Sequence, residues 1–454
     1  MIVLPIPFRD PADAFLPFAG RPWSMLLDGA VPEAGRGRWA YLCTDPRHRV
    51  TAEDDRVLLD GEAVAGDPFA ALEAALARLG PLEGDCPAPF RGGAVGFLGY
   101  ELGRWLERLP ARHGGAAGLP DMAVGLYDTI AAFDVVERRA WVVSDDAGRA
   151  RRLADALESA GSRAAPPDAD PGALPRSSWR PDLTRDEYAA RLRRVLGYIA
   201  AGDIYQANFT QRFTAPRAPD LDAYALYRRL RGLSPAPFAA FLNLGPGLQV
   251  ASASPERFLR LDAGGRIETR PIKGTRPRRR DPAEDRAEAE ALAASVKDRA
   301  ENLMIVDLLR NDLSRVAEPG SVRVPELCRI ESFASVHHLV SSVEARLRAG
   351  LGPVDLLRAS FPGGSITGAP KIRAMEIIDE LEASRRGPYC GSVLWIGRDG
   401  AMDSSIVIRT LVLTAGTVTA QAGGGIVADS DPGAEWEEML TKLRPLLATL
   451  GGWP

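Results

Sequence analysis

Two pairs of acidic residues have the spacing that places both carboxylates on one face of a helix. Asp298 and Glu301 form one pair, and Glu435 and Glu438 form the other. Residues three apart on a helix are neighbours on its surface. Four carboxylates converging from two helices would offer the hard oxygen ligands that Mg²⁺ prefers. The alternative is two solvated helix faces, on which Glu438 would pair with Lys442 at i+4.

Two basic residues are candidates for substrate binding or catalysis. Arg409 interrupts the apolar run IVIRTLVL (406–413). A buried guanidinium needs an anionic partner, so this arginine either faces a polar cleft or pairs with an internal acid. Lys273 lies in TRPIKGTRPR (269–278). A lysine becomes a nucleophile only when burial or neighbouring cations lower its pKa, and the alternative is a solvated loop lysine.

Two glycine-rich segments could supply backbone donors to an anion. PGGSITGAPK (362–371) leads into a helix that we expect to begin near Ala369. It is not a P-loop, because APK follows where Lys-Ser/Thr is required. QAGGGIV (421–427) closes a predicted strand. Either segment could instead be a tight turn.

These residues must be held by helices and strands. Thr184 with Glu187 forms a capping box that opens an amphipathic helix ending at Gly202. Asp281-Pro282 opens a long helix that can run to about Leu313, and Asp431-Pro432 opens the last helix. A strand is expected over 205–210 and an antiparallel meander over 389–427. Sheets and long helices without βαβα alternation exclude a doubly wound fold.

The domain organisation is suggested by one proline-rich stretch. Residues 162–181 hold five prolines and no apolar period, which predicts a linker. The sequence therefore divides into an amino-terminal domain over 1–161 and a second domain over 182–454, which carries the acidic pairs, Lys273 and Arg409.

Composition narrows the class of protein. The 454 residues have a net charge of −4, which gives no global basic field for nucleic acid. The arginines at 276–280 form the one candidate patch, and Asp281, Glu284 and Asp285 follow it directly. No apolar stretch is long enough to span a membrane. Four scattered cysteines and an N-terminus unlike a signal peptide predict a cytoplasmic protein.

Taken together, the second domain resembles the chorismate-utilising enzyme family. Looser matches precede the linker, in RPWSMLLDG (21–29) and GGAVGFLGYE (92–101). The resemblance implies an α+β fold in which two large antiparallel β-sheets pack as a sandwich with helices on the outside. The stronger matches run in order from residue 252 onward: SASPERF, TRPIKGTRPR, ENLMIVDLLRNDL, VHHLVSSV, SITGAPKIRAMEII, IVIRT and QAGGGIVADSDP.

Within the family, one lysine and one glutamine separate the reactions. The PIKGT form around Lys273 resembles members that aminate chorismate at C4, whereas anthranilate synthases typically have PIAGT. Isochorismate and salicylate synthases place a water-activating lysine at the position of Gln206. The resemblance therefore implies formation of 4-amino-4-deoxychorismate in the p-aminobenzoate branch of folate biosynthesis, and anthranilate formation is the alternative.

The resemblance also implies a role for each matching residue. Lys273 would be the nucleophile, Glu256 the acid that protonates the leaving hydroxyl, and His338 the histidine near the ring. Mg²⁺ would be bound by Glu301 and Glu438, with Asp298 and Glu435 acting through water. The substrate-binding positions would be Gln206, Gly274, Thr275, Tyr389, Arg409, Gly423, Gly424 and Gly425.

Two further expectations follow from the resemblance. None of the four cysteines lies in a glycine-flanked elbow, so ammonia would come from a separate glutamine amidotransferase subunit. Relatives also bind tryptophan in the first domain through a serine just after an LLx stretch. In MLLDGA (25–30) the matching residue is Gly29, which lacks that hydroxyl.

Overall fold

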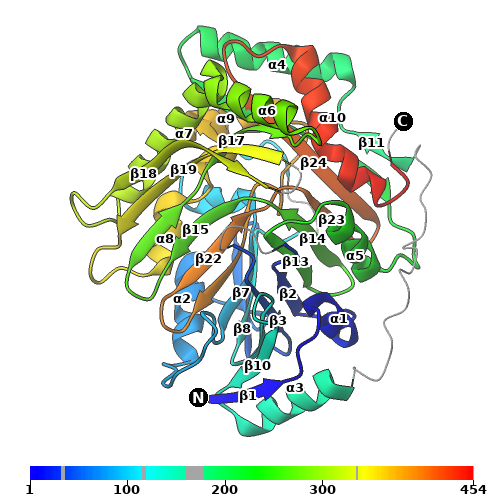
Figure 1. Cartoon of the computed structure of the whole chain (residues 1–454), viewed down its shortest axis with the longest axis vertical. Coiled ribbons are helices and arrows are strands. Elements are labelled where there is room, and N and C mark those ends of the chain that lie inside the picture. The colour runs from blue at the N-terminus through cyan, green and yellow to red at the C-terminus, as the bar shows by residue number, and fades with distance from the viewer. Residues whose placement is uncertain (32–35, 115–118, 160–177, 334–335, 453–454) are drawn as a thin grey trace.

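The fold is built on two antiparallel β-sheets that face each other. The structure, a computed structural model of the whole chain, describes residues 1–31, 36–114, 119–159, 178–333 and 336–452. Within these residues the strands form two sheets of twelve strands each. Figure 1 shows the sheets in the middle of the molecule with helices around them. This arrangement confirms the expected α+β sandwich.

The first sheet combines strands from both ends of the chain. All of its neighbouring strands pair antiparallel. A short strand, β20 (Gly368–Ala369), pairs with one end of β12. The order across the sheet is β1 (Ile2–Ile6), β10 (Arg139–Ser144), β9 (Thr129–Asp134), β3 (Trp39–Cys43), β2 (Ser24–Asp28), β13 (Phe238–Asn243), β14 (Leu248–Ser254), β23 (Thr410–Thr414), β24 (Thr417–Ile426), β12 (Gln206–Pro216) and β11 (Arg180–Pro181).

The second sheet is assembled in the same way. Strand β18 (Arg323–Ser332) pairs with β19 outside the main order. The order across the sheet is β17 (Ile272–Pro277), β19 (Val336–Arg346), β16 (Arg266–Thr269), β15 (Arg257–Leu261), β22 (Met402–Ile406), β21 (Ser392–Gly397), β7 (Gly93–Leu98), β8 (Met122–Tyr127), β4 (His48–Glu53), β5 (Arg56–Leu59) and β6 (Glu62–Ala63).

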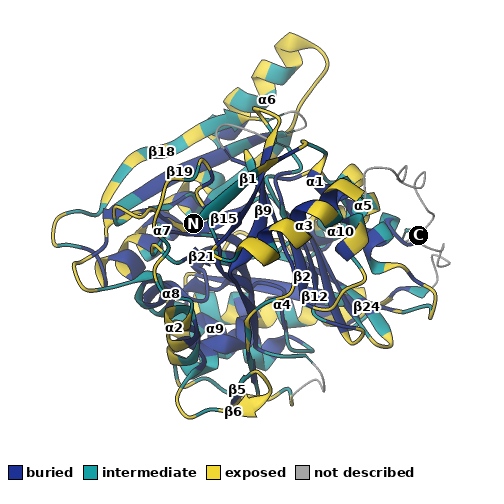
Figure 2. Cartoon of the chain, turned by 90° about the horizontal axis from the view of Figure 1, so that it is seen from below, coloured by how far each residue is buried: buried dark blue, intermediate teal, exposed yellow. Residues whose placement is uncertain are grey.

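Alternation along the strands divides the core into two layers. In β2, Met25 belongs to an apolar cluster shared with Val95 and Phe97 of the second sheet. Its neighbour Leu26 belongs to the larger cluster that includes Phe15 of the first helix. Successive side chains of a strand point to opposite faces, so one face packs between the sheets and the other packs under helices. Figure 2 shows the central strands buried and the outer surface of α3 exposed.

Helices cover the outer faces of both sheets. Against the first sheet pack α1 (Pro11–Phe15), α3 (Ala147–Ser159), α4 (Arg185–Ala200), α5 (Ala223–Leu233), α9 (Lys371–Leu381) and α10 (Pro432–Ala448). Against the second sheet lie α2 (Pro68–Arg78), α6 (Pro282–Ala294) and α7 (Val296–Ser314), and α8 (Pro353–Ser360) packs on α2 and α7. Short 3₁₀ segments lie at Leu16–Phe18, Tyr100–Trp105 and Gly364–Ile366. The predicted capping box at Thr184 and the cap at Asp431 are both present.

Two predicted elements are wrong, because each combines segments that belong to two separate elements of the fold. The long helix expected over 281–313 is two helices, separated at Ser295. Ser295 has an extended ψ of 110°, and its side chain accepts a hydrogen bond from the Asp298 backbone as the cap of α7. The expected meander over 389–427 is divided between the sheets, with β21 and β22 in the second and β23 and β24 in the first.

The predicted linker falls largely outside the described residues, which resume at 178. Strands from before and after it pair directly, since β2 pairs with β13 and β7 pairs with β21. Both sheets therefore contain strands from both of the predicted domains, and the boundaries of those domains stay a prediction. Among the described residues, no helix is long and apolar enough to cross a membrane.

Candidate active site

Lys273 lies on β17 with its side chain turned into the protein. Its Nζ donates a hydrogen bond to the carbonyl of Ser365 at 3.3 Å. Burial lowers its pKa from the usual value, although the carboxylates of Glu301, Glu256 and Glu438 act in the opposite direction. A lowered pKa increases the fraction of neutral amine, which is the form that can attack carbon.

Glu256 faces the same lysine from the turn between β14 and β15. Its side chain is buried, and burial raises its pKa, while the charge of Lys273 and a hydrogen bond with the Ser365 side chain lower it in part. A carboxyl group that holds its proton more tightly can serve as a general acid. Ser365 thus contacts both Lys273 and Glu256, through its carbonyl and its side chain respectively.

His338 lies in the neighbouring strand, opposite Thr275. The two residues are register partners between β17 and β19, and Thr275 Oγ1 is 2.8 Å from His338 Nδ1. Burial and the positive charges of Arg36 and Arg409 lower the pKa of His338 to about 4, so the ring is neutral at pH 7. The strand bulges between Lys273 and Thr275, where Gly274 has a φ of +76°. This bulge changes the direction of the strand between the two side chains.

The four carboxylates of the acidic pairs come from α7 and α10, as the helical spacing predicts. Lys297 Nζ lies 4.0 Å from Glu301 and 3.8 Å from Glu435, so the two helices meet at this ammonium group. Burial and neighbouring acids raise the pKa values of Glu301 and Glu435. For Glu438, burial acts to raise the pKa, but Lys442 at 2.7 Å and other lysines outweigh it and lower the pKa.

These acids are not arranged as a closed metal cage. Among the described residues, no three acidic, histidine or cysteine side chains are close enough to hold an ion. Ammonium groups stand between them instead, and the predicted pairing of Glu438 with Lys442 is present. Asp298 lies against the β17 bulge, since a Cβ on Gly274 would come within 2.8 Å of its Cγ.

The glycines of β24 lie next to the carboxylates of α10. A Cβ on Gly424 would lie 3.1 Å from Glu435 Oε2, and one on Gly425 would lie 2.5 Å from Gln206 Nε2. Gln206 is fully buried, and its amide nitrogen and oxygen have no hydrogen-bond partner among the described residues. A Cβ on Gly423 would collide with the carbonyl of Phe209 at 2.1 Å, so strand packing alone requires that glycine.

Arg409 lies in the crossover between the sheets, not inside a strand as predicted. Its φ of +53° belongs to the turn that takes the chain from β22 to β23. Its guanidinium donates to the carbonyl of Lys442 at 3.2 Å, and no carboxylate of the described residues pairs with it. Burial lowers its pKa, and Tyr389 and Glu438 raise it in part. The second predicted alternative, a pair with an internal acid, is not present among the described residues, and the polar cleft stays a prediction.

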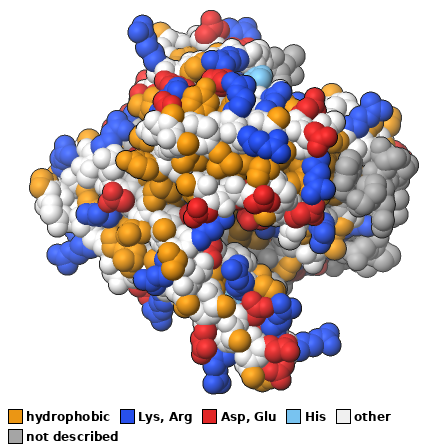
Figure 3. All heavy atoms as spheres, turned by 90° about the horizontal axis from the view of Figure 1, so that it is seen from above, with side chains coloured by type: hydrophobic (Ala, Val, Ile, Leu, Met, Phe, Trp, Pro, Cys, Tyr) orange, Lys and Arg blue, Asp and Glu red, His pale blue; other side chains and the backbone are white. Residues whose placement is uncertain are grey.

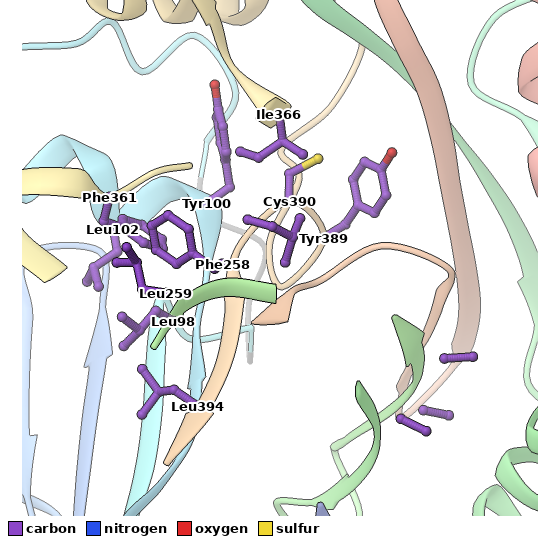
Figure 4. Close-up of a cluster of buried hydrophobic side chains, with 14 of the residues drawn as sticks. Leu98, Tyr100, Leu102, Phe258, Leu259, Phe361, Ile366, Tyr389, Cys390 and Leu394 are labelled. Atoms are coloured by element: carbon purple, nitrogen blue, oxygen red, sulfur yellow. The ribbon is translucent and has the colours of Figure 1, made fainter. Parts of the chain in front are cut away.

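Tyr389 joins the site to the apolar core. It is buried, and burial raises its pKa well above the usual value. Figure 4 shows Tyr389 and Cys390 near Ile366 of the glycine-rich segment, with Phe258 close to Phe361. The sequence-predicted residues thus come from both sheets and from α7 and α10. The roles assigned to them stay predictions.

Sequence reasoning missed three residues at this site. Lys297 precedes Asp298 and could have been recognised as the residue four positions before Glu301 on the same helix face. Lys442 was considered only as a surface partner, yet its Nζ also donates to the Gly423 carbonyl at 2.8 Å. Ser365 lies in the SITGAPK string, and nothing in its local pattern signals contacts with Glu256 and Lys273.

Three of the four arginines of the run at 276–280 lie within 4 Å of acidic side chains. Arg278 pairs with Asp285 at 2.9 Å, and Arg279 pairs with Glu288 at 2.6 Å. Arg276 lies 3.9 Å from Asp298. Figure 3 shows basic and acidic side chains interspersed on the face seen from above. These contacts assign the three arginines to the packing of α6 and α7 against β17.

A cavity lies away from Lys273 and from the acidic residues of α7 and α10. This cavity, of about 630 Å³, opens between the sheets, and its lining includes Leu27, Asp28, Arg36 and Trp395. Gly29 follows these strand residues, and a Cβ there would lie 1.9 Å from the carbonyl of Gly37. The backbone therefore leaves no room for a serine side chain at position 29, whose hydroxyl the sequence already lacks.

Comparison with known proteins shows the family to which the chain belongs. The family model described as chorismate binding enzyme matches residues 30–448, so the chain belongs to the chorismate-binding enzyme family. The aminodeoxychorismate synthase component 1 of Klebsiella aerogenes is 47% identical over 455 residues, covering 99% of this chain and 98% of the relative. The anthranilate synthase component 1 of Thermus thermophilus is 42% identical over 445 residues, covering 96% and 94%.

The fold has a solved counterpart. The crystal structure of anthranilate synthase component I from Streptococcus pneumoniae TIGR4 superimposes with a TM-score of 0.80 at 30% identity. The match covers 91% of this chain and 92% of that chain. The two-sheet arrangement is therefore that of an established member of the family.

Proposed function

We propose that this chain converts chorismate and ammonia to 4-amino-4-deoxychorismate. The observation that carries the proposal is the inward-facing amine of Lys273, which donates to the Ser365 carbonyl and interacts electrostatically with the buried Glu256 and with Glu301 of α7. The names of relatives at 44–47% identity over nearly the whole chain support the same reaction. Chorismate is a dicarboxylate, and Arg409 offers a guanidinium without a carboxylate partner in the described residues.

The reaction proceeds in two displacements. The neutral amine of Lys273 adds to C2 of chorismate, the ring double bond shifts, and the C4 hydroxyl leaves. Glu256 gives its proton to that hydroxyl, so water departs and Glu256 becomes a carboxylate. Ammonia then adds to C4, the double bond returns, and Lys273 leaves as the free amine. Glu256 takes the extra proton from the new C4 nitrogen, which restores the starting state.

The acids of α7 and α10 fit a divalent cation in chemistry and in charge. Glu301 and Glu438 would bind Mg²⁺, with Asp298 and Glu435 acting through water, in the region where Lys297 and Lys442 now stand between the carboxylates. When bound, Mg²⁺ would supply a Lewis acid and an anchor for the ring carboxylate.

Ammonia has to be delivered to C4 from outside this chain. We infer a separate glutamine amidotransferase subunit as the source, in keeping with the component 1 names of the relatives. The buried Gln206 amide beside Gly425 is a polar group that a small nucleophile or the substrate can contact. A cytoplasmic location is proposed for the pair of subunits.

Mass spectrometry of the products made from chorismate, an ammonium salt and MgCl₂ tests this function. We expect 4-amino-4-deoxychorismate with its enolpyruvyl group retained. Fluorescent anthranilate as the product would contradict the proposal and favour the alternative reaction. Lys273→Ala should lose product formation with glutamine-derived ammonia, and Lys297→Ala is the control that removes a lysine from the acids but not the nucleophile. A Lys273→Ala enzyme as fast as the wild type would exclude the nucleophilic role.

A further inference from the structure

Arg36 is a buried arginine that reaches a distant part of the chain. Only 5% of its side chain is exposed, and its guanidinium lies 2.6 Å from Glu331 Oε2 on β18. The guanidinium carbon also lies 5.2 Å from the centroid of the Phe333 ring, just past the end of that strand. Arg36 precedes β3, so the contact joins the first sheet's side of the molecule to the edge of the second sheet.

The two partners of Arg36 flank His338. Glu331 is the register partner of His338 between β18 and β19, and directly opposed residues project from the same face of a sheet. The Phe333 ring centroid lies 5.3 Å from that of His338. Thr275 contacts His338 from β17 on the other side. The imidazole therefore contacts Phe333 and Thr275 and has Glu331 as its cross-strand neighbour, and Arg36 contacts two of these three residues, Glu331 and Phe333.

The Arg36–Glu331 ion pair also balances the negative charge of Glu331 beside the His338 ring. An unpaired Glu331 next to His338 would favour the protonated ring. Arg36 binds one carboxylate oxygen of Glu331, and Arg270 binds the other. The charged groups that face His338 are then Glu331 from β18, Arg36 from the segment before β3 and Arg409 from the crossover between the sheets.

We propose that Arg36 is a positioning residue for the reaction at Lys273, which holds Glu331 and Phe333 so that His338 keeps one orientation beside the substrate ring. This inference rests on the proposed function, in which His338 lies next to bound chorismate. Arg36 also lines the cavity between the sheets. It therefore connects the wall of that cavity to the wall of the site.

The test compares Arg36→Gln with a matched control. Arg38→Gln removes an arginine that lines the same cavity two residues away but pairs with Asp134 at 2.6 Å. Because small misplacements in a site are costly, Arg36→Gln should lower kcat by about ten- to a hundredfold with little change in KM. Arg38→Gln should stay near the wild-type kcat. Arg36→Lys, which keeps the charge, should recover part of the loss.

A second readout separates positioning from a general loss of packing. In protein labelled with ¹³C-histidine, the His338 resonance is assigned by its absence in His338→Asn. Arg36→Gln removes a positive charge and should raise the pKa of His338 by about half a unit or more. Glu331→Gln removes a negative charge and should lower it. A packing defect alone would not move the two variants in opposite directions.

The outcomes are distinct. Absence of 4-amino-4-deoxychorismate from the wild-type reaction would remove the proposed function, whatever the variants do. With an active wild type, an unchanged kcat and His338 titration in Arg36→Gln would overturn the role of Arg36. Equal losses in Arg36→Gln and Arg38→Gln, with no change in the titration, would also overturn it, because the effect would then belong to the cavity wall.

Discussion

A lysine meets acidic side chains at each end of α7, Lys371 of α9 at one end and Lys297 of α7 itself at the other, in opposite arrangements. At its C-terminal end, Lys371 lies 2.7 Å from Asp312 and also donates to the carbonyl of Ser360, and both side chains are largely buried. At its N-terminal end, Lys297 lies 3.8–4.0 Å from two glutamates that crowd each other. The first is a closed ion pair, whereas the second is a loose grouping of charges at which we propose that Mg²⁺ binds.

The largest loss of activity should come from a substitution at the N-terminal end of α7. Glu301→Gln should lower kcat by about a hundredfold or more, because it removes a ligand of the proposed cation. The free energy of unfolding should stay the same or rise, since like charges are relieved near Glu435. Steady-state rates and urea unfolding of the same preparation check both results. A large loss of stability would mean that Glu301 belongs to a structural pair like Asp312.

At the C-terminal end of α7, a substitution in the Asp312–Lys371 pair should lower stability more than activity. Lys371→Met leaves the Asp312 carboxylate buried without its cation and should lower the free energy of unfolding at pH 7 by about 3 kcal/mol. Its kcat should fall less than that of Glu301→Gln. The control is Arg310→Ala on α7, whose pair with Asp307 is exposed and should contribute less than about 0.5 kcal/mol. Equal stability of the two variants in urea would contradict the distinction.

The closed pair should also give a pH dependence of stability. Burial raises the pKa of Asp312 to about 6, although Lys371 lowers it in part. Its unfolded value is about 3.9, so between these values the folded chain binds a proton that the unfolded chain does not. This contribution to stability is therefore present at low pH and is lost as pH rises through about 6. Urea unfolding at pH 5 and pH 7 should show a smaller difference between wild type and Asp312→Asn at the higher pH.

The smallest expected effect is stabilisation of the protein by Mg²⁺ at the N-terminal end of α7. MgCl₂ should raise the melting temperature of the wild type by on the order of 1–3 °C relative to NaCl at equal ionic strength. Glu301→Gln with Glu438→Gln should abolish the shift, and Arg310→Ala should retain it. A shift that survives in the double variant would place the cation elsewhere.

The sequence predicted local features well and long-range ones poorly. The acidic pairs and the caps at Thr184 and Asp431 depend on spacing within one element, and all of them are present. The break at Ser295 was missed because serine occurs inside helices as well as at N-caps, and its residue type alone does not tell the two apart. The contact of Arg36 with Glu331 joins residues 295 positions apart, and no local pattern encodes it. Lys273 was found through the family resemblance, because its burial depends on strands far away in the chain.

The interleaving of the strands has a consequence for biosynthesis. In the second sheet β7 has two neighbours, β8 and β21, and β21 is made only after residue 391 leaves the ribosome. Until then one edge of β7 is unpaired, although its own sequence is already apolar throughout. Pairing of β7 on that edge must therefore wait until β21 has been synthesised, and the unpaired apolar edge is prone to aggregation in the meantime.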